Sequence, residues 1–571
     1  MKKLLVYLKD YKLECVLAPL FKMLEAFFEL LVPLVMASII DRGIADRDIS
    51  YILRMGTVLL ALAAVGLISS VTAQFFAAKA AVGFSAGLRQ ALFNHIQGLD
   101  YTNIDKVGTS TLITRMTADI NQLQNGVNMV LRLFLRSPII VFGATIMAFT
   151  IDLEAALVFV VAIPVLAAVV YGVMFGTRPL YRRVQEKLDR VLSITRDNLN
   201  GVRVIRAFAR EDEELKDFYE NNNALSGLQK FVGKISALTN PVTYVIINLA
   251  IIILIYHGAI QVDSGILTQG EVVALINYMS QILVELVKLA SLIILLTKAL
   301  ASGDRVLSVF EVQNGSVAEV LTQKISLHNN LPFIQFDHVH LTYDGAGDET
   351  LTDIDFSVNR GDTVGIIGGT GSGKTSLVNL IPAFYRATKG NIFIDGRNVN
   401  SYDEEELRKK IGVVPQKAVL FKGTIKDNLK WGNPDATEDD LWEALELSQA
   451  KEVVEGKGGL NGEVTQNGKN FSGGQRQRLT IARALIRHPE ILILDDSSSA
   501  LDYATDARLR AALISISDRT TIFIVSQRTT SIMHADRIIV LDDGHIAGTG
   551  SHDELLKGCD IYREIHNAGT K

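Results

Sequence analysis

Six long apolar segments in the first 300 residues constrain the fold of this chain more than any other feature. A helix needs about 20 apolar residues to cross a bilayer, and each segment approaches or exceeds that length. The segments cover roughly residues 15–40, 52–82, 127–150, 154–176, 242–262 and 272–300. We therefore expect an all-α transmembrane domain with six spans. The sixth span is the least regular, because it contains the charged residues Glu271, Glu285, Lys288 and Lys298.

Basic residues concentrate in two long connections between these spans. Residues 178–210 contain nine Arg and Lys residues, and residues 83–126 add Arg89, Lys106 and Arg115. Connections rich in Lys and Arg remain on the cytoplasmic side of a membrane. We therefore expect a multi-pass protein of the cell (inner) membrane, with both termini and the C-terminal domain in the cytoplasm.

The same two connections have helical spacing and few helix-breaking residues. Long ordered loops without secondary structure are uncommon, so the membrane helices are expected to continue well into the cytoplasm. Short connecting helices around residues 109–117 and 210–218 are expected at their tips. At the N-terminus, charged residues interrupt the apolar run, which predicts an amphipathic helix on the membrane surface over residues 1–14.

The pattern changes after the sixth span to short β-branched runs that alternate with helical stretches. The runs beginning at Val364, Ile392, Ile411, Ile491, Ile522 and Ile538 read as strands. This alternation predicts a mostly parallel α/β domain. The predicted organisation is a surface helix (1–14), a transmembrane domain with cytoplasmic helical extensions (15–305), a linker (306–330) and the α/β domain (331–571).

Composition gives no support for a nucleic-acid-binding protein or for a protein stabilised by disulfides or zinc. The formal net charge of −5 gives no reason to expect a nucleic-acid partner. The two cysteines, Cys15 and Cys559, lie far apart in the sequence without the spacing of metal ligands, so neither a disulfide framework nor a zinc site is expected.

The α/β domain contains a phosphate-binding loop in its first part. The segment Gly368-Gly-Thr-Gly-Ser-Gly-Lys374-Thr375 follows a predicted strand and precedes a helix. Glycines allow backbone N–H groups to surround phosphate oxygens at a helix N-terminus. In such a loop the lysine reaches the β- and γ-phosphates and the Thr375 hydroxyl binds Mg²⁺. Asp495 ends a buried apolar strand, where a carboxylate is costly unless it meets a cation. We therefore predict that Asp495 also holds Mg²⁺.

A third motif, Ser472-Gly473-Gly474-Gln475, lies between this loop and Asp495. This order of motifs resembles the ATP-binding cassette (ABC) proteins. The resemblance identifies Tyr343 as the aromatic that stacks on adenine, Gln416 as the Q-loop glutamine and Asp502 as the D-loop aspartate. With six spans before the cassette, the chain resembles a half-size ABC exporter of the multidrug type.

The resemblance implies a dimer that binds ATP and Mg²⁺ between two cassettes. ATP would be bound by Tyr343 and by the loop residues of this chain, and in trans by the signature motif and D-loop of the other cassette. The loop residues are Gly368, Gly369, Thr370, Gly371, Ser372, Gly373, Lys374, Thr375 and Ser376; the residues acting in trans are Ser472, Gly473, Gly474, Gln475 and Asp502. Mg²⁺ would be held by Thr375, Gln416 and Asp495.

Two positions depart from the family pattern. Asp496 stands where the family has the catalytic Glu, and Gln527 stands where it has His. Removing one methylene withdraws a carboxylate by about 1.5 Å, and a misplacement of about 1 Å can cost about 10²-fold in rate. Glutamine cannot carry the positive charge that a histidine can. We therefore expect Asp496, Gln527 and Gln416 to form a weakly hydrolytic site.

The signature motif Ser472-Gly473-Gly474-Gln475 is intact. A symmetric dimer with two weakly hydrolytic sites would gain nothing from an intact motif. The sequence therefore resembles the degenerate-site half of a bacterial heterodimeric ABC exporter, with a non-identical second half-transporter as partner. The expected function is ATP-driven export of amphipathic small molecules, drugs or lipids by alternating access. Alternatives are a regulatory or channel-like subunit gated by ATP, and an importer with exporter architecture.

Charged residues inside the spans are candidates for substrate contact. Glu25 and Glu29 share a helix face, and Glu285 and Lys288 are close enough in sequence to pair. Charged groups in a membrane are costly and often functional. The sequence leaves open whether these residues contact substrate or pair with one another, and an acidic cavity would favour cationic substrates.

Overall fold

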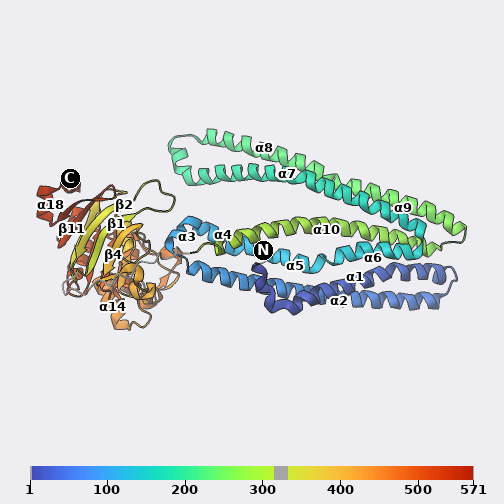
Figure 1. The fold of residues 1–571 in the computed structure, drawn as a ribbon, viewed down its shortest axis with the longest axis horizontal. Coiled ribbons are helices and arrows are strands. Elements are labelled where there is room, and N and C mark those ends of the chain that lie inside the picture. The colour runs from blue at the N-terminus through green and yellow to red at the C-terminus, as the bar shows by residue number, and fades with distance from the viewer. Residues whose placement is uncertain (1–2, 314–331, 570–571) are drawn as a thin grey trace. The chain divides into compact units, whose positions relative to one another are not determined.

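The structure is a computed structural model that describes residues 3–313 and 332–569. The chain divides into two compact units, Met1–Gly98 with Thr109–Val312, and Leu99–Gly108 with Gln313–Lys571. We call them the membrane unit and the cassette unit and describe each by itself (Figure 1).

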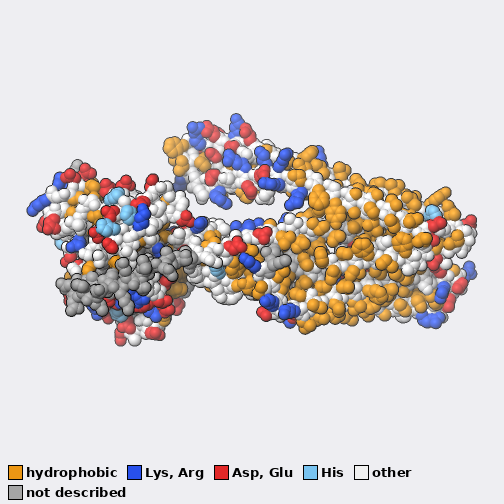
Figure 2. Space-filling view, viewed as in Figure 1, with side chains coloured by type: hydrophobic (Ala, Val, Ile, Leu, Met, Phe, Trp, Pro, Cys, Tyr) orange, Lys and Arg blue, Asp and Glu red, His pale blue; other side chains and the backbone are white. Residues whose placement is uncertain are grey.

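The membrane unit consists of helices. Its elements are η1 (Leu4–Tyr11), α1 (Lys12–Ser38), η2 (Ile39–Ile44), α2 (Ile49–Gln97), α4 (Thr109–Thr114), η3 (Arg115–Asp119), α5 (Ile120–Leu133), α6 (Arg136–Ile151), α7 (Leu153–Ala207), α8 (Glu211–Ala237), α9 (Thr239–Asp263) and α10 (Gln269–Phe310). Six helical segments among the described residues are long and apolar enough to cross a membrane. Figure 2 shows hydrophobic side chains gathered over one stretch of this unit, with Lys, Arg, Asp and Glu towards its two ends. The predicted six-helix transmembrane architecture is confirmed.

Short polar residues set where several of these helices begin. The carboxylate of Asp48 accepts a hydrogen bond from Tyr51 N at the start of α2, and Asp152 accepts one from Ala155 N at the start of α7. Thr268 and Glu271 form a reciprocal capping box at the start of α10. Each cap satisfies backbone donors that a helix leaves free at its first turn.

Small residues allow the membrane helices to approach one another closely, as is usual inside a bilayer. The main core of the unit is formed by side chains of α1, α6, α7, α9 and α10 and includes many alanines. At Gly126 of α5 an added Cβ would lie 2.4 Å from the Cβ of Ala299 in α10. The third span is interrupted at residues 134 and 135, so that Arg136 begins a new helix, α6.

The cassette unit contains two main sheets. Its strands of four or more residues are β1 (Ile334–Leu341), β2 (Leu351–Val358), β3 (Thr363–Gly368), β4 (Lys389–Ile394), β6 (Ile411–Val414), β9 (Ile491–Asp495), β10 (Thr521–Val525), β11 (Arg537–Asp542) and β12 (His545–Gly550). The larger sheet has the order β12-β11-β3-β10-β9-β6, and the smaller one the order β2-β1-β4-β5, with β5 at Arg397–Asn398. All six predicted strands are present. Strands β1, β2 and β12, which pair antiparallel, were not predicted. In β2 buried residues alternate with more exposed ones, and in β12 exposed residues alternate with partly buried ones.

Helices pack against these sheets and form a second, mainly helical core. The helices of the unit are α3 (Tyr101–Val107), α11 (Lys374–Leu380), α12 (Glu404–Lys409), α13 (Ile425–Lys430), α14 (Glu438–Leu447), α15 (Lys451–Glu455), α16 (Gly473–Leu485), α17 (Tyr503–Ile514), α18 (His552–Gly558) and α19 (Asp560–Gly569). The second core combines side chains of α13, α14, α16 and α17.

The short helix α3 belongs to the cassette unit, although it lies in the connection between the second and third spans. The ring of Tyr101 lies 4.7 Å from that of Phe384, measured between centroids. Tyr385 donates a hydrogen bond of 2.6 Å to Asp105, and Lys106 forms an ion pair of 2.7 Å with Asp344. These contacts tie α3 to the cassette.

The short helix expected around residues 109–117 is present as α4 and the start of η3, in the membrane unit, where Asp119 pairs with Arg305 of α10. The preceding helix α3, which belongs to the cassette unit, was not predicted. The Asp100 cap and Gly108, which has a left-handed φ of 81°, delimit α3. In the other connection the chain turns at residues 208–210, and residues 211–218 are the start of α8.

The expected linker, residues 306–330, falls partly within α10, which continues to Phe310. Its residues 314–330 lie outside the described residues.

Candidate functional site

Four polar segments meet at one edge of the larger sheet because they follow neighbouring parallel strands. The phosphate-binding loop follows β3, Asp495 ends β9, Gln416 follows β6 and Gln527 follows β10. In the parallel pairing Val525 of β10 lies beside Asp495 of β9, and Val414 of β6 lies beside Leu494. Ligands of open α/β sheets bind at the carboxyl ends of the strands. The topology therefore brings the candidate site residues to one place.

The phosphate-binding loop needs its glycines. An added Cβ at Gly368 would lie 2.1 Å from the carbonyl oxygen of Leu541. Gly373 has a φ of 92°, a left-handed conformation that other residues adopt only at a cost. The side chain of Lys374 is buried and donates to the carbonyl oxygens of Gly368, at 3.0 Å, and Gly369, at 2.5 Å. The loop is thus closed around its own lysine, with α11 beginning directly behind it.

Thr375 and Asp495 lie together as two potential Mg²⁺ ligands. The Thr375 hydroxyl donates to Asp495 Oδ1 at 3.1 Å. Burial raises the pKa of Asp495 above the usual range of an aspartate. It also lowers the pKa of Lys374 below the usual range of a lysine. A hydroxyl and a buried carboxylate are oxygen ligands of the kind that Mg²⁺ prefers. The loop and this pair fit a Mg²⁺-bound nucleoside triphosphate.

Asp496 has a strained backbone and a direct side-chain partner. Its φ is 45°, in the left-handed region that Asp tolerates better than most residues. Gln416 Nε2 donates to Asp496 Oδ2 at 3.4 Å. Burial raises the pKa of Asp496. Gln527 is exposed. The pairing of Gln416 with Asp496 was not foreseen, because the two residues are 80 positions apart.

Tyr343 lies beside the helix that follows the loop. Its hydroxyl donates to Ser376 Oγ at 3.0 Å, and its ring stands edge-on to Tyr385 at 5.1 Å between centroids. One aromatic ring is therefore fixed next to the phosphate-binding loop, as a base-stacking role requires.

The signature motif forms the N-terminus of α16. Ser472 caps the helix and Gln475 completes a reciprocal capping box, with the Ser472 N–H donating to Gln475 Oε1 at 2.9 Å. Ser472 and Gly473 are exposed. Asp502 caps α17, where its carboxylate accepts from Thr505 N at 2.9 Å. A capped helix N-terminus that faces outward is a ready anion-binding surface.

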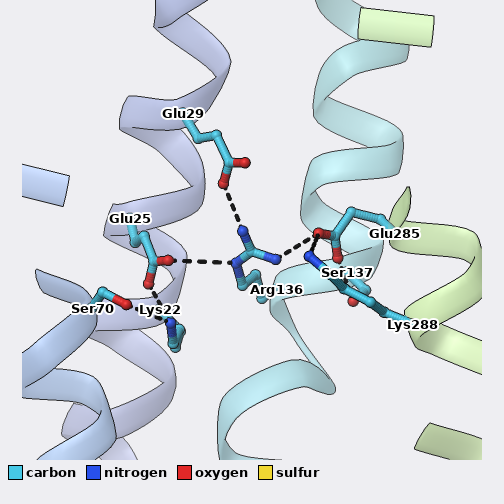
Figure 3. A network of polar contacts seen from close by, with 8 residues as sticks. All are labelled: Lys22, Glu25, Glu29, Ser70, Arg136, Ser137, Glu285 and Lys288. Atoms are coloured by element: carbon cyan, nitrogen blue, oxygen red, sulfur yellow. Dashed lines mark hydrogen bonds and ion pairs between the residues drawn. The ribbon is translucent and has the colours of Figure 1, made fainter. Parts of the chain in front are cut away.

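A second polar cluster lies inside the membrane unit and connects α1, α6 and α10 (Figure 3). Arg136, at the start of α6, is at its centre. It donates to Glu285 Oε1 and to Glu29 Oε2, both at 2.6 Å. Glu285 pairs with Lys288 at 2.8 Å, which is one of the possibilities that the sequence left open. The sequence reading missed Arg136, although it is a basic residue within the third apolar segment.

The cluster as a whole is electrically neutral. Lys22 pairs with Glu25 at 2.5 Å and also donates to Ser70 of α2, and Ser137 donates to Glu285. Its charged members are three bases and three acids: Lys22, Arg136 and Lys288 with Glu25, Glu29 and Glu285. Of the possibilities that the sequence left open, these residues pair with one another, since each carboxylate has a basic partner.

Both units resemble known families. The family described as "ABC transporter transmembrane region" matches residues 15–286, and the family described as "ABC transporter" matches residues 351–499. The chain is 36% identical over 574 residues to the "Uncharacterized ABC transporter ATP-binding protein YfiB" of Bacillus subtilis (strain 168), which covers 100% of this chain and 98% of that protein.

Other relatives match over the same length. The chain is 37% identical to the "Uncharacterized ABC transporter ATP-binding protein Rv1273c" of Mycobacterium tuberculosis (strain ATCC 25618 / H37Rv), covering 98% of this chain and 96% of that protein. It is 31% identical to the "Putative multidrug export ATP-binding/permease protein YgaD" of Bacillus subtilis (strain 168), covering 99% and 98%.

Proposed function

The chain belongs to the ABC transporter family, as one polypeptide that joins a transmembrane region to an ATP-binding cassette, and from that premise we propose that it is the weakly hydrolytic subunit of a heterodimeric exporter. It is a multi-pass membrane protein of the exporter type.

ATP binding in this chain would use residues already close together. Lys374 and the loop N–H groups would hold the phosphates, and Tyr343 would stack on the base. Thr375, Asp495 and Gln416 would hold Mg²⁺, which supplies charge neutralisation at the β- and γ-phosphates. The basic connections between the spans support a cytoplasmic position for the cassette in the cell membrane.

The observation that carries the proposal is the state of Asp496. Its carboxylate is one methylene shorter than that of a Glu, and Gln416 holds it through a hydrogen bond. A general base must reach the water that it activates, and the geometry of that contact comes before its pKa. With Gln527 offering no positive charge, this site supports ATP binding and slow hydrolysis.

The signature motif supports a non-identical partner. Ser472 and Gly473 are exposed at the start of α16, where they are free to complete the ATP site of another cassette. In a dimer of two copies of this chain, each intact signature motif would face a site with Asp496 and Gln527, so both sites would hydrolyse ATP slowly. A partner with Glu and His at the positions of Asp496 and Gln527 would form one hydrolytic and one ATP-retaining site.

A groove in the cassette unit offers a place for the partner's membrane unit. It has a volume of about 370 Å³ and is lined by aromatic and basic side chains, among them Tyr101, Phe384, Phe421, Trp431, Arg408, Arg483 and Arg487. The α7–α8 corner of this chain, residues 208–214, carries an exposed aromatic ring and several charged residues, among them the ion pair of Arg210 with Glu213. Phe208 is 74% exposed there, and four acidic residues (211–214) begin α8. We propose that the corresponding corner of each subunit inserts into the groove of the other.

The test compares ATP turnover by this chain alone and with its partner. We expect slow turnover alone and fast turnover in the complex. Ser472→Ala should lower turnover in the complex more than Asp496→Asn does, because only Ser472 serves the hydrolytic site. Rapid hydrolysis by this chain alone, as a symmetric dimer, would overturn the proposal.

Transport itself is tested in sealed vesicles. An exporter accumulates an amphipathic substrate against its gradient when ATP is supplied, whereas a gated channel only equilibrates it. The absence of uphill movement for the reconstituted complex would favour the channel-like alternative.

A further inference from the structure

The charged cluster around Arg136 contains an unsatisfied donor. Arg136 is 7% exposed, and its Nε is buried without a hydrogen-bond acceptor. The nearest carboxylate oxygen on that side, Glu25 Oε1, is 3.9 Å away. A buried donor without an acceptor is costly. This nitrogen therefore marks a position where an acceptor would be favourable.

The unsatisfied Nε lies next to the ion pair of Arg136 with Glu29, whose carboxylate side chain is partly exposed. Figure 3 shows Nε and Nη2 of Arg136 directed towards α1, where they approach Glu25 and Glu29, while Nη1 is directed towards Glu285. The side chain of Glu29 is 40% exposed, whereas that of Glu285 is 3% exposed. Glu29 is thus the partner of Arg136 that a ligand can most easily displace.

The α1-facing edge of the guanidinium suits an oxyanion. A guanidinium binds a carboxylate or phosphate best through two parallel N–H donors. In the structure only one of the two donors on this edge, Nη2, has an acceptor. An oxyanion that replaced Glu29 there would engage both, and Glu29 would then be left without a basic partner.

The net charge of the cluster indicates which second group the ligand carries beside the oxyanion. The cluster is neutral, and an uncompensated charge within a membrane protein is costly. A ligand with only a negative or only a positive group would leave the cluster with a net charge. A ligand that carries an ammonium group as well as the oxyanion would pair the displaced Glu29 and keep the total at zero.

We propose that Arg136 and Glu29 form a binding site for a zwitterionic headgroup, with the oxyanion on Nε and Nη2 of Arg136 and the ammonium group on Glu29. The proposal rests on the proposed export function and names its substrate class. The ligand class is a phosphate or carboxylate joined to an ammonium group, whether on a lipid-like amphiphile or on a small soluble molecule.

The test is equilibrium binding to the purified full-length chain, delipidated in dodecyl maltoside so that no zwitterionic lipid competes. Radiolabelled dodecylphosphocholine is displaced by dodecyl phosphate, by dodecyltrimethylammonium and by phosphocholine, which has no tail. We expect dodecylphosphocholine to bind at least about tenfold more tightly than either singly charged amphiphile. Displacement by phosphocholine identifies a soluble ligand, and displacement only by tailed compounds identifies a lipid-like one.

Substitutions separate recognition from folding. Arg136→Gln would leave Glu285 buried with one basic partner fewer and can fail to fold, so the decisive variant is Glu29→Gln. It should weaken dodecylphosphocholine binding about tenfold without weakening dodecyl phosphate, which needs only Arg136. The control Lys298→Met removes an exposed charge from α10 outside the cluster and should change neither affinity.

Equal affinity of the wild-type chain for all three amphiphiles, or an equal loss for all three in Glu29→Gln, would overturn the proposal. The measurement uses no nucleotide. It can therefore fail while the predicted asymmetry of ATP hydrolysis holds, and it can succeed while that asymmetry fails.

Discussion

At the scale of single residues, one methylene separates Asp496 from the glutamate that ABC cassettes use at this position. In the structure Gln416 donates a hydrogen bond to the carboxylate of Asp496, and the backbone of Asp496 is left-handed. In the proposed function, the position of this carboxylate limits the activation of water, although a carboxylate is present.

Restoring both residues should restore hydrolysis. We expect Asp496→Glu to raise ATP turnover by this chain about 10²-fold, and Asp496→Glu with Gln527→His to raise it further, because a cationic donor towards the γ-phosphate is regained. The two gains need not multiply. Steady-state phosphate release measures the effect.

The control for this prediction is the same double variant with Lys374→Ala, which removes the phosphate-binding lysine. Turnover should return to background. Unchanged turnover in Asp496→Glu with Gln527→His would show that the limit lies elsewhere.

A pH dependence follows from Asp495, whose pKa burial raises. A carboxylate with a raised folded-state pKa favours folding below its unfolded pKa, and this contribution is lost as the pH rises through the folded pKa. Mg²⁺ binds the ionised form. Mg²⁺-ATP affinity should therefore fall on acidification, by about tenfold per pH unit once the pH is below the raised pKa.

Isothermal calorimetry of Mg²⁺-ATP binding across this range checks the prediction. Asp495→Asn should bind more weakly at neutral pH and lose most of the slope. The remaining slope would report protonation of ATP itself, and an identical slope in both proteins would exclude Asp495 as its source.

At the scale of elements, the close approach of α5 and α10 depends on a residue without a side chain. Gly126→Ala would place a methyl group 2.4 Å from the Cβ of Ala299. We expect a loss of about 1–3 kcal/mol in the free energy of unfolding, the usual range for overpacking, measured as a lower Tm of the detergent-solubilised chain.

Two further variants make this prediction specific. Ala299→Gly in the Gly126→Ala background should recover most of the loss, because it removes the opposing methyl group. Gly201→Ala in α7, where an added Cβ meets nothing within 4 Å, should leave the Tm unchanged or raise it, since alanine favours a helix over glycine. A lower Tm in Gly201→Ala would mean that helix packing is not the cause.

At the scale of the whole molecule, partner recognition should depend on the α7–α8 corner. We expect Phe208→Ser to reduce the amount of partner that co-purifies with this chain at least about threefold, because it removes an exposed aromatic ring from the proposed contact. Quantitative pull-down of the co-expressed subunits measures it. Tyr219→Ser, which removes an exposed ring from α8 outside the corner, is the matched control, and equal losses in both variants would contradict the prediction.

The proposed retention of ATP at this site has a consequence for the complete transporter. If the weak site keeps its ATP after the partner's site has hydrolysed its own, the two cassettes should stay in contact between cycles. Spin-label distances across the two cassettes should then remain short with ATP bound and lengthen only when nucleotide is removed.

Features that depend on local chemistry could be predicted from the amino-acid sequence. Apolar length predicts a membrane-spanning helix because a bilayer has a fixed thickness, and all six spans were found. The phosphate-binding loop, Ser472 and Asp495 were readable because a short motif at a strand or helix end carries its own geometry. Buried parallel strands such as Ile491–Asp495 were readable as uninterrupted apolar runs.

The contacts between residues far apart in the chain are set by the folded structure. The pairing of Gln416 with Asp496, the docking of α3 against Phe384 and Tyr385, and the neutral cluster around Arg136 all join residues far apart in the chain. No local pattern encodes such contacts, because they arise when separate elements pack. The sequence shows that Glu29 is an acidic residue within a span. Its pairing with Arg136 follows only from the packing of α1 against α6.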